Sequence, residues 1–514
     1  MGVFIGGLYL VAVGGLVFFG VHRFKMVFGY LFNRPGPPVE GESVALPREG
    51  ATVCIQCPVY NEPLVIEGLL KSVAAIDWYP GQLEIQILDD SDDETPSIIS
   101  RWLEKNPRWA GVCRHLRRSD RSGYKAGALA SGMRQSRACF FAVFDADFRP
   151  SSDFLRVMMP AFTDPSVGLV QARWDFSNRR AGFLTRLQAV FLDAHFVVEQ
   201  VARAAGGLFF NFNGTAGIWR RDALEDAGGW SADTVTEDLD ISYRAQMKGW
   251  RFVYLPHYTV KSELPEHITA FKSQQRRWTK GGIQVMRKLL PALMRSNAPL
   301  SIKIEGFYHL TVGFVHFFLV LFALVFVPFL VVLGPVPGGA FWFVHPIVIL
   351  GAGASTVLFY LVGQFCRDRR WLDLFLTLVM APLVLSFGLA MSLTCLWAVF
   401  DGLFTSGGEF VRTPKGGRNM GLGGILRSGR FLSQYRILAG CEGVLAVVML
   451  GGAATFAERG LFAIASVLVV KAVGYIALVG WFVGDSIGGD EVPQRLEPIP
   501  ATDSGLPFSG RRME

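Results

Sequence analysis

Apolar residues gather towards both ends of this chain, and polar residues fill its middle. One apolar stretch runs from Gly2 to Gly20, and five more follow after residue 300, at Phe307–Leu333, Phe341–Phe365, Leu372–Phe400, Ile437–Phe456 and Leu461–Val483. A helix rises 1.5 Å per residue, so about 20 apolar residues suffice to cross a bilayer. The pattern predicts a multi-pass helical membrane protein with one polar domain after its first span.

The polar middle alternates short strands with helices. Strands are expected at Thr52–Cys57, Leu83–Leu88, Val112–Leu116, Ala138–Phe144 and Val167–Trp174, and helices at Leu64–Ile76, Pro96–Lys105 and Lys125–Gln135. This order is typical of a doubly wound α/β domain, which binds its ligand at the carboxyl ends of the strands.

The composition agrees with a membrane protein. Of the 514 residues, 51% are hydrophobic, and the mean hydropathy is +0.34. The net charge of +7 does not indicate nucleic acid, because the basic residues lie largely beside apolar segments, where they mark the cytoplasmic side. His22, Arg23 and Lys25 follow the first apolar stretch. We therefore expect a cytosolic polar domain, membrane lipids as partners and no nucleic acid.

Two of the expected strands end in acids. Asp89 and Asp90 end one of them, and Asp145 and Asp147 end another. Residues two apart in an extended chain face the same side, so Asp145 and Asp147 can hold one hard cation, which would neutralise a diphosphate leaving group. A single Asp-x-Asp more often marks a turn or a solvated strand end. Two acidic ends in one sheet favour a metal and nucleotide site.

A helix is expected from Thr236 to Gly249, with Glu237 and Asp238 in its first turn. Thr236 is a good N-cap, and the helix dipole favours an ionised carboxylate at this end. Such a carboxylate at the rim of a cleft can act as a general base. The alternative is that both acids only cap an ordinary helix.

Two other segments carry candidate binding residues. Lys125 opens a helix after a turn of small residues, which suits close approach to a uridine or phosphate. A second helix, expected to begin near Pro265, carries Gln274, Arg277 and Trp278. The indole offers a flat face for a sugar, and the guanidinium can stabilise a developing diphosphate charge. Basic residues and one Trp on a surface helix near a membrane would also give this pattern.

These motifs, in this order, resemble those of family 2 glycosyltransferases with the GT-A fold, in particular the membrane-embedded synthases that include cellulose and hyaluronan synthases. The phrases YNEPLVIEGLLKSV, QILDDSDDET, GYKAGAL, FDADF, FNGTAG and QQRRW are most similar to those of the cellulose-synthase-like A and C proteins, which make mannan or glucan backbones. The similarity covers roughly Thr52 to Trp278.

The resemblance implies a role for each matching residue. Asp89 and Asp90 would contact the nucleotide, with Lys125 and Asp145 also in the nucleotide-sugar site. Asp145 and Asp147 would hold Mg²⁺ or Mn²⁺. Asp238, beside Glu237, would deprotonate the acceptor hydroxyl. The remaining three residues, on the expected helix near Pro265, would bind the acceptor end and the pyrophosphate: Gln274, Arg277 and Trp278.

The resemblance extends to a loop between the last apolar stretches. Phe410, Thr413 and Lys415 resemble the gating loop of cellulose synthase, although Arg412 replaces its Val. If all five later stretches crossed, this basic loop would lie outside. We therefore expect Leu372–Phe400 to lie along the interface or to re-enter, so that five spans remain.

The expected fold is an α/β GT-A domain, with a mixed and mostly parallel sheet, inserted between transmembrane helices. The expected boundaries are an anchor at 1–25, a linker at 26–48, the catalytic domain at 49–282, interfacial helices at 283–305, two spans at 306–366, a re-entrant helix and gating-like loop at 367–435, two spans at 436–484 and a disordered tail at 485–514.

The expected function is processive, inverting synthesis and export of a β-linked glucan or mannan, with UDP-glucose or GDP-mannose as donor. The alternative is single transfer to a lipid such as ceramide or diacylglycerol. A third possibility, a transporter with a nucleotide-sensing domain, would leave the acids dispensable. Lys471, inside the last apolar stretch, is expected to line a glycan channel or to pair with Glu442.

Overall fold

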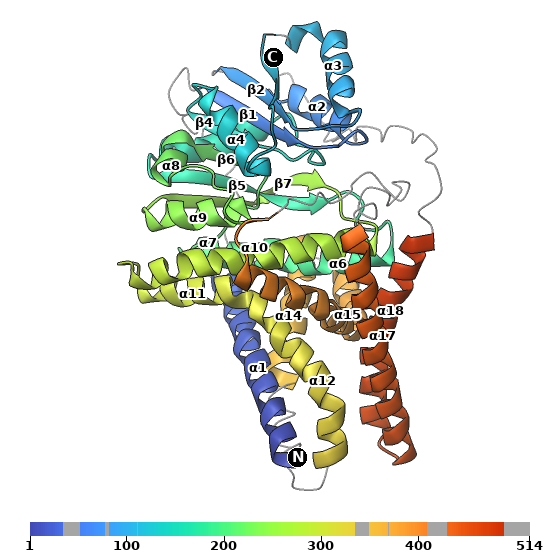
Figure 1. The fold of residues 1–514 in the computed structure, drawn as a ribbon. Helices are drawn as coiled ribbons and strands as arrows, with labels where there is room; N and C mark the ends of the chain where they lie inside the picture. Colours follow the sequence, from blue (N-terminus) through green and yellow to red (C-terminus); the bar gives the residue numbers. More distant parts are fainter. Residues whose placement is uncertain are drawn as a thin grey trace, which may run out of the picture.

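The computed structural model describes residues 1–33, 52–77, 82–109, 111–334, 349–368, 370–408 and 429–487. A sheet domain lies at one side of a layer of helices, and a group of long apolar helices extends from the other side (Figure 1).

The sheet has seven strands in the order β3-β2-β1-β4-β6-β5-β7. Their bounds are β1 Val53–Val59, β2 Leu83–Asp89, β3 Cys113–Arg117, β4 Phe140–Val143, β5 Val167–Phe176, β6 Gly217–Arg220 and β7 Arg251–Ser262. All neighbours pair in parallel except β6, which is antiparallel to both β4 and β5. The expectation of a mixed, mostly parallel sheet is confirmed. The sequence analysis did not identify β6 or β7.

Helices cover both faces of the sheet because the strand side chains are buried on both sides. The domain contains α2 Ile66–Ala74, α3 Thr95–Lys105, α4 Tyr124–Arg134, α5 Phe154–Met158, α6 Phe183–Asp193, α7 Gln200–Ala205, α8 Arg221–Asp226 and α9 Glu237–Met247. Ile55 and Phe144 pack on the side of α2, α3 and α5, whereas Phe141 and Trp219 pack on the side of α4, α8 and α9. This packing leaves the carboxyl ends of β1, β2 and β4 open to form a cleft.

The remaining helices join the domain to the membrane region. They are α1 Gly2–Phe32, α10 Ile268–Arg295, α11 Leu300–Thr311, α12 Val315–Leu333, α14 Ser355–Asp368, α15 Trp371–Phe404, α17 Gly429–Glu458 and α18 Phe462–Ile487. In the described part of the chain, five helices are long and apolar enough to cross a membrane: Gly2–Phe32, Leu300–Leu333, Trp371–Phe404, Ser433–Glu458 and Phe462–Ser486. Both α1 and α18 extend beyond the boundaries expected at residues 25 and 484.

The second half of α15 runs alongside α10. The rings of Phe387 on α15 and Phe271 on α10 stack with centroids 6.0 Å apart. Further along, Gly402 packs so closely that an added Cβ would lie 2.7 Å from the carbonyl oxygen of Lys280. Figure 1 draws α15 across the direction of α17 and α18. Its interfacial placement was expected from charge, and whether it crosses the bilayer stays a prediction.

Candidate active site

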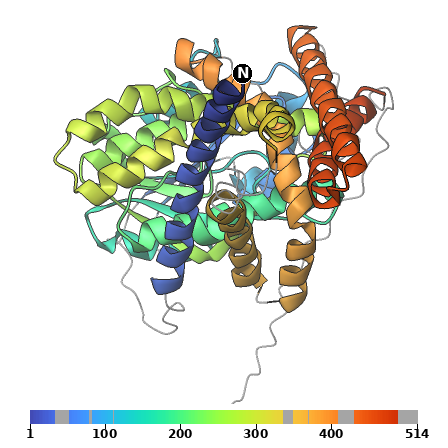
Figure 2. The ribbon, with the colours of Figure 1, turned by 90° about the horizontal axis from the view of Figure 1, so that it is seen from below.

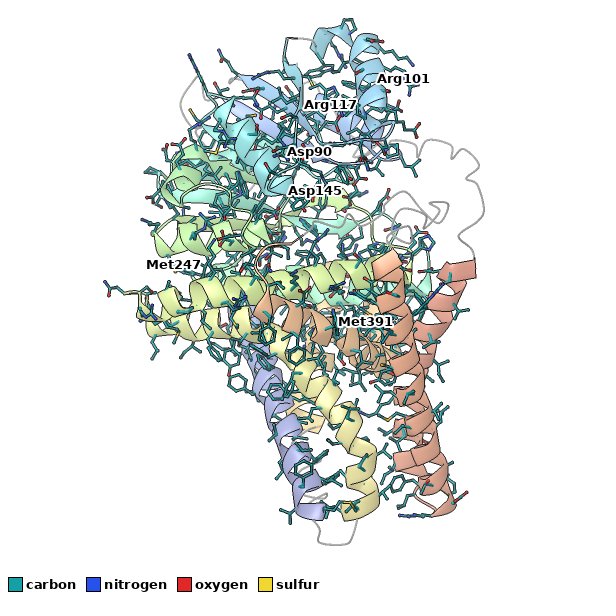
Figure 3. All side chains as sticks on the ribbon, viewed as in Figure 1. Asp90, Arg101, Arg117, Asp145, Met247 and Met391 are labelled. Carbon is teal, nitrogen blue, oxygen red and sulfur yellow. The ribbon has the colours of Figure 1, made fainter. Side chains whose placement is uncertain are left out.

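A cleft of about 150 Å³ lies at the carboxyl ends of the strands, between the sheet and α10. Its walls include most of the residues that the sequence singled out: Asp90, Lys125, Asp145, Asp147, Glu237, Asp238, Gln274, Arg277 and Trp278. Figure 3 shows Asp90 and Asp145 near each other at this edge of the sheet. Segments almost 190 residues apart in the chain thus meet in one site.

Lys125 stands at the centre of the acidic side chains. Its Nζ lies 2.5 Å from Oδ1 of Asp145 and 3.8 Å from Oε1 of Glu237, and it donates a hydrogen bond of 2.9 Å to the carbonyl oxygen of Gly214. Burial opposes the charge on the amine, but the two carboxylates outweigh it and raise the pKa of Lys125. The turn before α4 sets this position through Gly123, whose φ of +69° favours glycine. Lys125 is therefore protonated and carries its positive charge beside Asp145.

Asp238 lies in the first turn of α9, as the sequence predicted. Thr236 occupies the N-cap position, but among the described residues its hydroxyl has no hydrogen-bond partner. The expected side-chain cap is therefore absent. Thr236 instead packs against α10 at Gly281, where an added Cβ would lie 2.3 Å from the Thr236 side chain. This contact brings the start of α9 against the helix that carries Arg277.

The acids of α9 are harder to ionise than their helix position suggested. Burial and, second, the charge of Glu237 together raise the pKa of Asp238 to about 7, although the charge of Lys125 opposes them. Burial also raises the pKa of Glu237, against the field of Lys125. The expectation that the helix dipole would favour the ionised form omitted this desolvation, which is the larger effect. A carboxylate with a pKa near 7 is suited to accept a proton at physiological pH.

Asp145 and Asp147 supply hard oxygen donors on one wall of the cleft. The backbone N–H of Asp145 donates to the Thr215 hydroxyl at 3.0 Å, and Asp147 accepts a hydrogen bond from Ser262. Among the described residues, no group of three or more His, Cys, Asp and Glu side chains could hold a metal alone. Carboxylates are the ligands that Mg²⁺ and Mn²⁺ prefer, so Asp145 and Asp147 could hold such an ion if a diphosphate and water supplied its other ligands.

α10 brings three side chains to the opposite wall. Burial lowers the pKa of Arg277, and the charges of Glu237 and Asp145 oppose that effect, so the guanidinium faces the acidic cluster. The buried Oε1 of Gln274 has no hydrogen-bond partner among the described residues. A buried acceptor without a partner is costly, and a ligand hydroxyl would satisfy it. Trp278 lines both this cleft and a larger cavity beside it.

The two acids that end β2 differ in position. Asp89 is buried, bound to His115 at 2.7 Å and to the Ser91 backbone N–H at 2.9 Å, and it does not line the cleft. These hydrogen bonds outweigh burial and lower the pKa of Asp89. Asp90 lines the cleft and is held by Arg118. The geometry therefore places only Asp90 where a nucleotide would contact it, because successive strand residues face opposite sides.

Sequence reasoning missed part of the cleft wall. Tyr60 follows β1 directly, and the guanidinium carbon of Arg121 lies 3.2 Å from the centre of its ring. Both residues line the cleft beside Asp90. The signal was present, because Tyr60 sits at the carboxyl end of a strand, as the acids do. Only charged side chains at these strand ends were expected to form the site.

A second cavity, of about 1740 Å³, begins at Asp238 and Trp278 and continues between the membrane helices. Residues of α1, α12, α14, α15 and α18 line it, and it reaches Gly460–Ala463 at the start of α18. Lys471 also lines it, with its Nζ 4.3 Å from the centre of the Phe322 ring. The alternative that Lys471 pairs with Glu442 is wrong, because Glu442 binds Lys272.

The gating-like loop with Phe410, Thr413 and Lys415 lies outside the described residues, as do most of the expected linker and tail.

Comparisons with known proteins identify the family of the chain. The family described as "Glycosyl transferase family group 2" matches residues 140–399. The chain is 39% identical over 324 residues to the Arabidopsis thaliana protein named "Probable glucomannan 4-beta-mannosyltransferase 15", covering 60% of each chain. It is 45% identical over 251 residues to glucomannan 4-beta-mannosyltransferase 1 of Oryza sativa subsp. japonica, covering 48% of each. The chain thus spans about half to three fifths of the length of these relatives.

The fold resembles that of a solved structure, the mannosyltransferase PcManGT from Pyrobaculum calidifontis in complex with GDP-Man and Mn²⁺. The TM-score is 0.50 and the identity 19%, with 78% of this chain and 99% of that chain covered. The family match spans just over half of the chain and includes Asp145, Asp238 and the Gln274–Trp278 segment. The chain belongs to the glycosyl transferase family group 2.

Proposed function

We propose that this protein is a processive, inverting hexosyltransferase that builds a β-linked mannan from GDP-mannose. Support for mannose comes from the relatives, which are named glucomannan 4-beta-mannosyltransferases. Their name also favours a β-1,4 linkage. UDP-glucose remains the donor to compare, because glucose and mannose differ at one carbon and the relatives' name contains both sugars.

The cleft residues support one in-line displacement. Asp238 accepts the proton of the acceptor hydroxyl, whose oxygen attacks the anomeric carbon while the nucleoside diphosphate leaves from the other face. Arg277 and Lys125 stabilise the negative charge that forms on the diphosphate. A divalent cation held by Asp145 and Asp147 would neutralise part of the same charge. One displacement inverts the anomeric centre, so an α-linked donor yields a β-linkage.

The observation that carries the choice of a polymer is the large cavity. It starts at the base Asp238 and at the flat indole ring of Trp278, on which a sugar can stack. It reaches Gly460, in the connection between α17 and α18. A growing chain that leaves the cleft in this direction would pass α15 and Lys471. This path supports export of the glycan by the same protein that makes it.

Export of the glycan requires that the sheet domain lie on the cytosolic side of the membrane, which depends on the helices that cross it. We propose that α15 lies along the cytosolic interface, because its second half packs on α10, which also forms a wall of the cleft. The described spans would then be α1, α11–α12, α17 and α18, with the sheet domain in the cytosol, and the further span expected at Phe341–Phe365 lies partly outside the described residues.

The second candidate is single transfer to a lipid. Apolar side chains such as Phe326, Leu330 and Leu389 dominate the membrane half of the cavity, and an acyl chain could occupy it as well as a glycan.

The test is incubation of the purified protein in lipid nanodiscs with Mn²⁺ and, in turn, GDP-mannose and UDP-glucose, followed by sizing of the radiolabelled product. We expect a long polymer from GDP-mannose that a β-mannanase digests. One hexose on a solvent-extractable lipid would instead establish the second candidate. A polymer made only from UDP-glucose would keep the synthase and change its sugar.

A further inference from the structure

An ion pair without solvent exposure joins the catalytic helix α10 to the membrane helix α17. The Nζ of Lys272 lies 2.7 Å and 2.8 Å from the two carboxylate oxygens of Glu442. Both side chains are 0% exposed. Taking two charges out of water is costly, and a buried pair is stable only with good geometry. A pair with this burial therefore fixes the two helices to each other closely.

The end of α18 binds the same helix at its start. Asp485 accepts a hydrogen bond of 3.0 Å from the backbone N–H of Thr269, and its other oxygen lies 3.0 Å from Nδ1 of His267. The first backbone N–H groups of a helix lack partners within the helix, and Asp485 supplies one from another element. A third contact runs from Arg276 to Gln434 of α17 at 3.0 Å.

These contacts lie on one side of α10, and the cleft lies on the other. Lys272 and Arg276 are four residues apart and share the face towards α17. Gln274, Arg277 and Trp278 line the cleft. A small rotation of α10 about its axis would therefore move these three side chains relative to Asp238, which α9 holds.

We propose that Lys272, Glu442 and Asp485 are positioning residues, through which the α17–α18 hairpin sets the rotation and height of α10 and so the place where the acceptor sugar binds. This inference rests on the proposed function, because it assigns Gln274 and Trp278 to the acceptor. Most of the donor side of the cleft belongs to the sheet domain, which supplies Tyr60, Asp90 and Lys125, and α10 contributes Arg277 to it.

The test variant is Glu442→Gln, which keeps the shape of the side chain and leaves Lys272 buried without its counter-charge. A misplacement of about 1 Å at a reacting group can lower a rate about 100-fold. We expect kcat for transfer to fall between about 10-fold and 100-fold, and the product to become shorter. The affinity for GDP, measured by titration of the same folded protein, should fall much less than kcat, because Arg277 is the one α10 side chain that we assign to the diphosphate.

The charge-reversed double variant Lys272→Glu, Glu442→Lys should recover a large part of the lost kcat, because the pair is restored in the opposite sense. The matched control is Gln364→Met on α14. It removes a 2.7 Å hydrogen bond to Asp193 at the same boundary without touching α10, and transfer should stay at the wild-type rate.

Two results would overturn the inference. One is an unchanged kcat in folded Glu442→Gln. The other is an equal loss of GDP affinity and transfer without recovery in the double variant, since that is the behaviour of a general loss of structure. If the wild-type protein transfers no sugar, the proposed function is wrong. The two results above concern variants of an active wild-type protein, so the two failures can be told apart.

Discussion

Asp238 must lose its proton before it can accept one, and its surroundings oppose that loss. Burial and Glu237 raise its pKa to about 7, and Lys125 limits the rise. A carboxylate that is hard to ionise is a stronger base than an ordinary aspartate. The burial that makes the charged form of Asp238 costly therefore also suits this residue to its proposed task.

The first prediction concerns Asp238→Asn, which keeps the size of the side chain and removes the base. We expect kcat to fall about 10²-fold to 10⁴-fold, with little change in GDP affinity. Initial rates of radiolabel transfer and a GDP titration check this. A variant that retains more than a tenth of the wild-type rate would show that the base lies elsewhere.

The second prediction is the pH dependence. Asp238 has a raised pKa and acts in its deprotonated form, so kcat/KM should be constant above about pH 7 and fall as the pH drops through that value. A cation bound at Asp145 adds positive charge and shifts the midpoint downwards. Rates from pH 5 to 9 give the profile, and a midpoint well above 8 would contradict it.

The sequence could predict Asp145, Asp147 and Asp238 because their positions follow from local rules for strand ends and helix starts. It could not predict that Asp89 turns inwards to His115, because that depends on a neighbouring strand. Nor could it predict that the ammonium of Lys125 sits between Asp145 and Glu237. Burial, which decides the pKa of Asp238, is also a property of the assembled cleft.

At the scale of elements, α15 shows how composition and packing can disagree. It is long and apolar enough to span a bilayer, yet Phe387 and Gly402 pack along α10. The parity of basic loops in the sequence favoured the interface for this segment. By contrast, β6 was missed, because four residues between a glycine-rich loop and a helix give too little alternation to be identified as a strand.

The third prediction tests α15. Both of its ends should face the cytosol, so Trp371→Cys and Thr405→Cys, in a protein without native cysteines, should react with a membrane-impermeant maleimide only from the cytosolic side. Labelling of sealed, oriented vesicles before and after permeabilisation measures this. Reaction of the two positions from opposite sides would mean that α15 crosses the bilayer.

At the scale of the whole molecule, the cleft and the large cavity are neighbours, because Asp238 and Trp278 line both, and the sheet domain and the membrane helices together form their walls. Figure 2 shows α1 on one side of the membrane region and α17 and α18 on the other. No single segment of the sequence encodes these walls, since they combine residues from Leu16 on α1 to Lys471 on α18.

The fourth prediction concerns a variant that places a bulky side chain in the large cavity. Gly388 on α15 lines the cavity, and an added Cβ there meets no atom within 4 Å. Gly388→Phe should therefore fold normally and place its ring in the cavity. We expect shorter products with the first transfer retained, measured by sizing of the labelled glycan.

The control for this variant is Gly480→Phe on α18. Gly480 also has open space around it but does not line the cavity, so the product length should stay at the wild-type value. Equal shortening in both variants, or full-length product from Gly388→Phe, would contradict the proposed path of the glycan.

The attachment of α10 to α17 and α18 links the chemistry to the lipid around the protein. A bilayer thicker or thinner than the apolar length of a helix pair makes that pair tilt, at a cost of a fraction of a kcal/mol per Å. Because Glu442 and Asp485 hold α10, such a tilt moves the helix that carries Gln274 and Trp278. Hydrophobic mismatch thereby becomes a variable of catalysis, and the acyl-chain length of the host membrane should tune the length of the glycan.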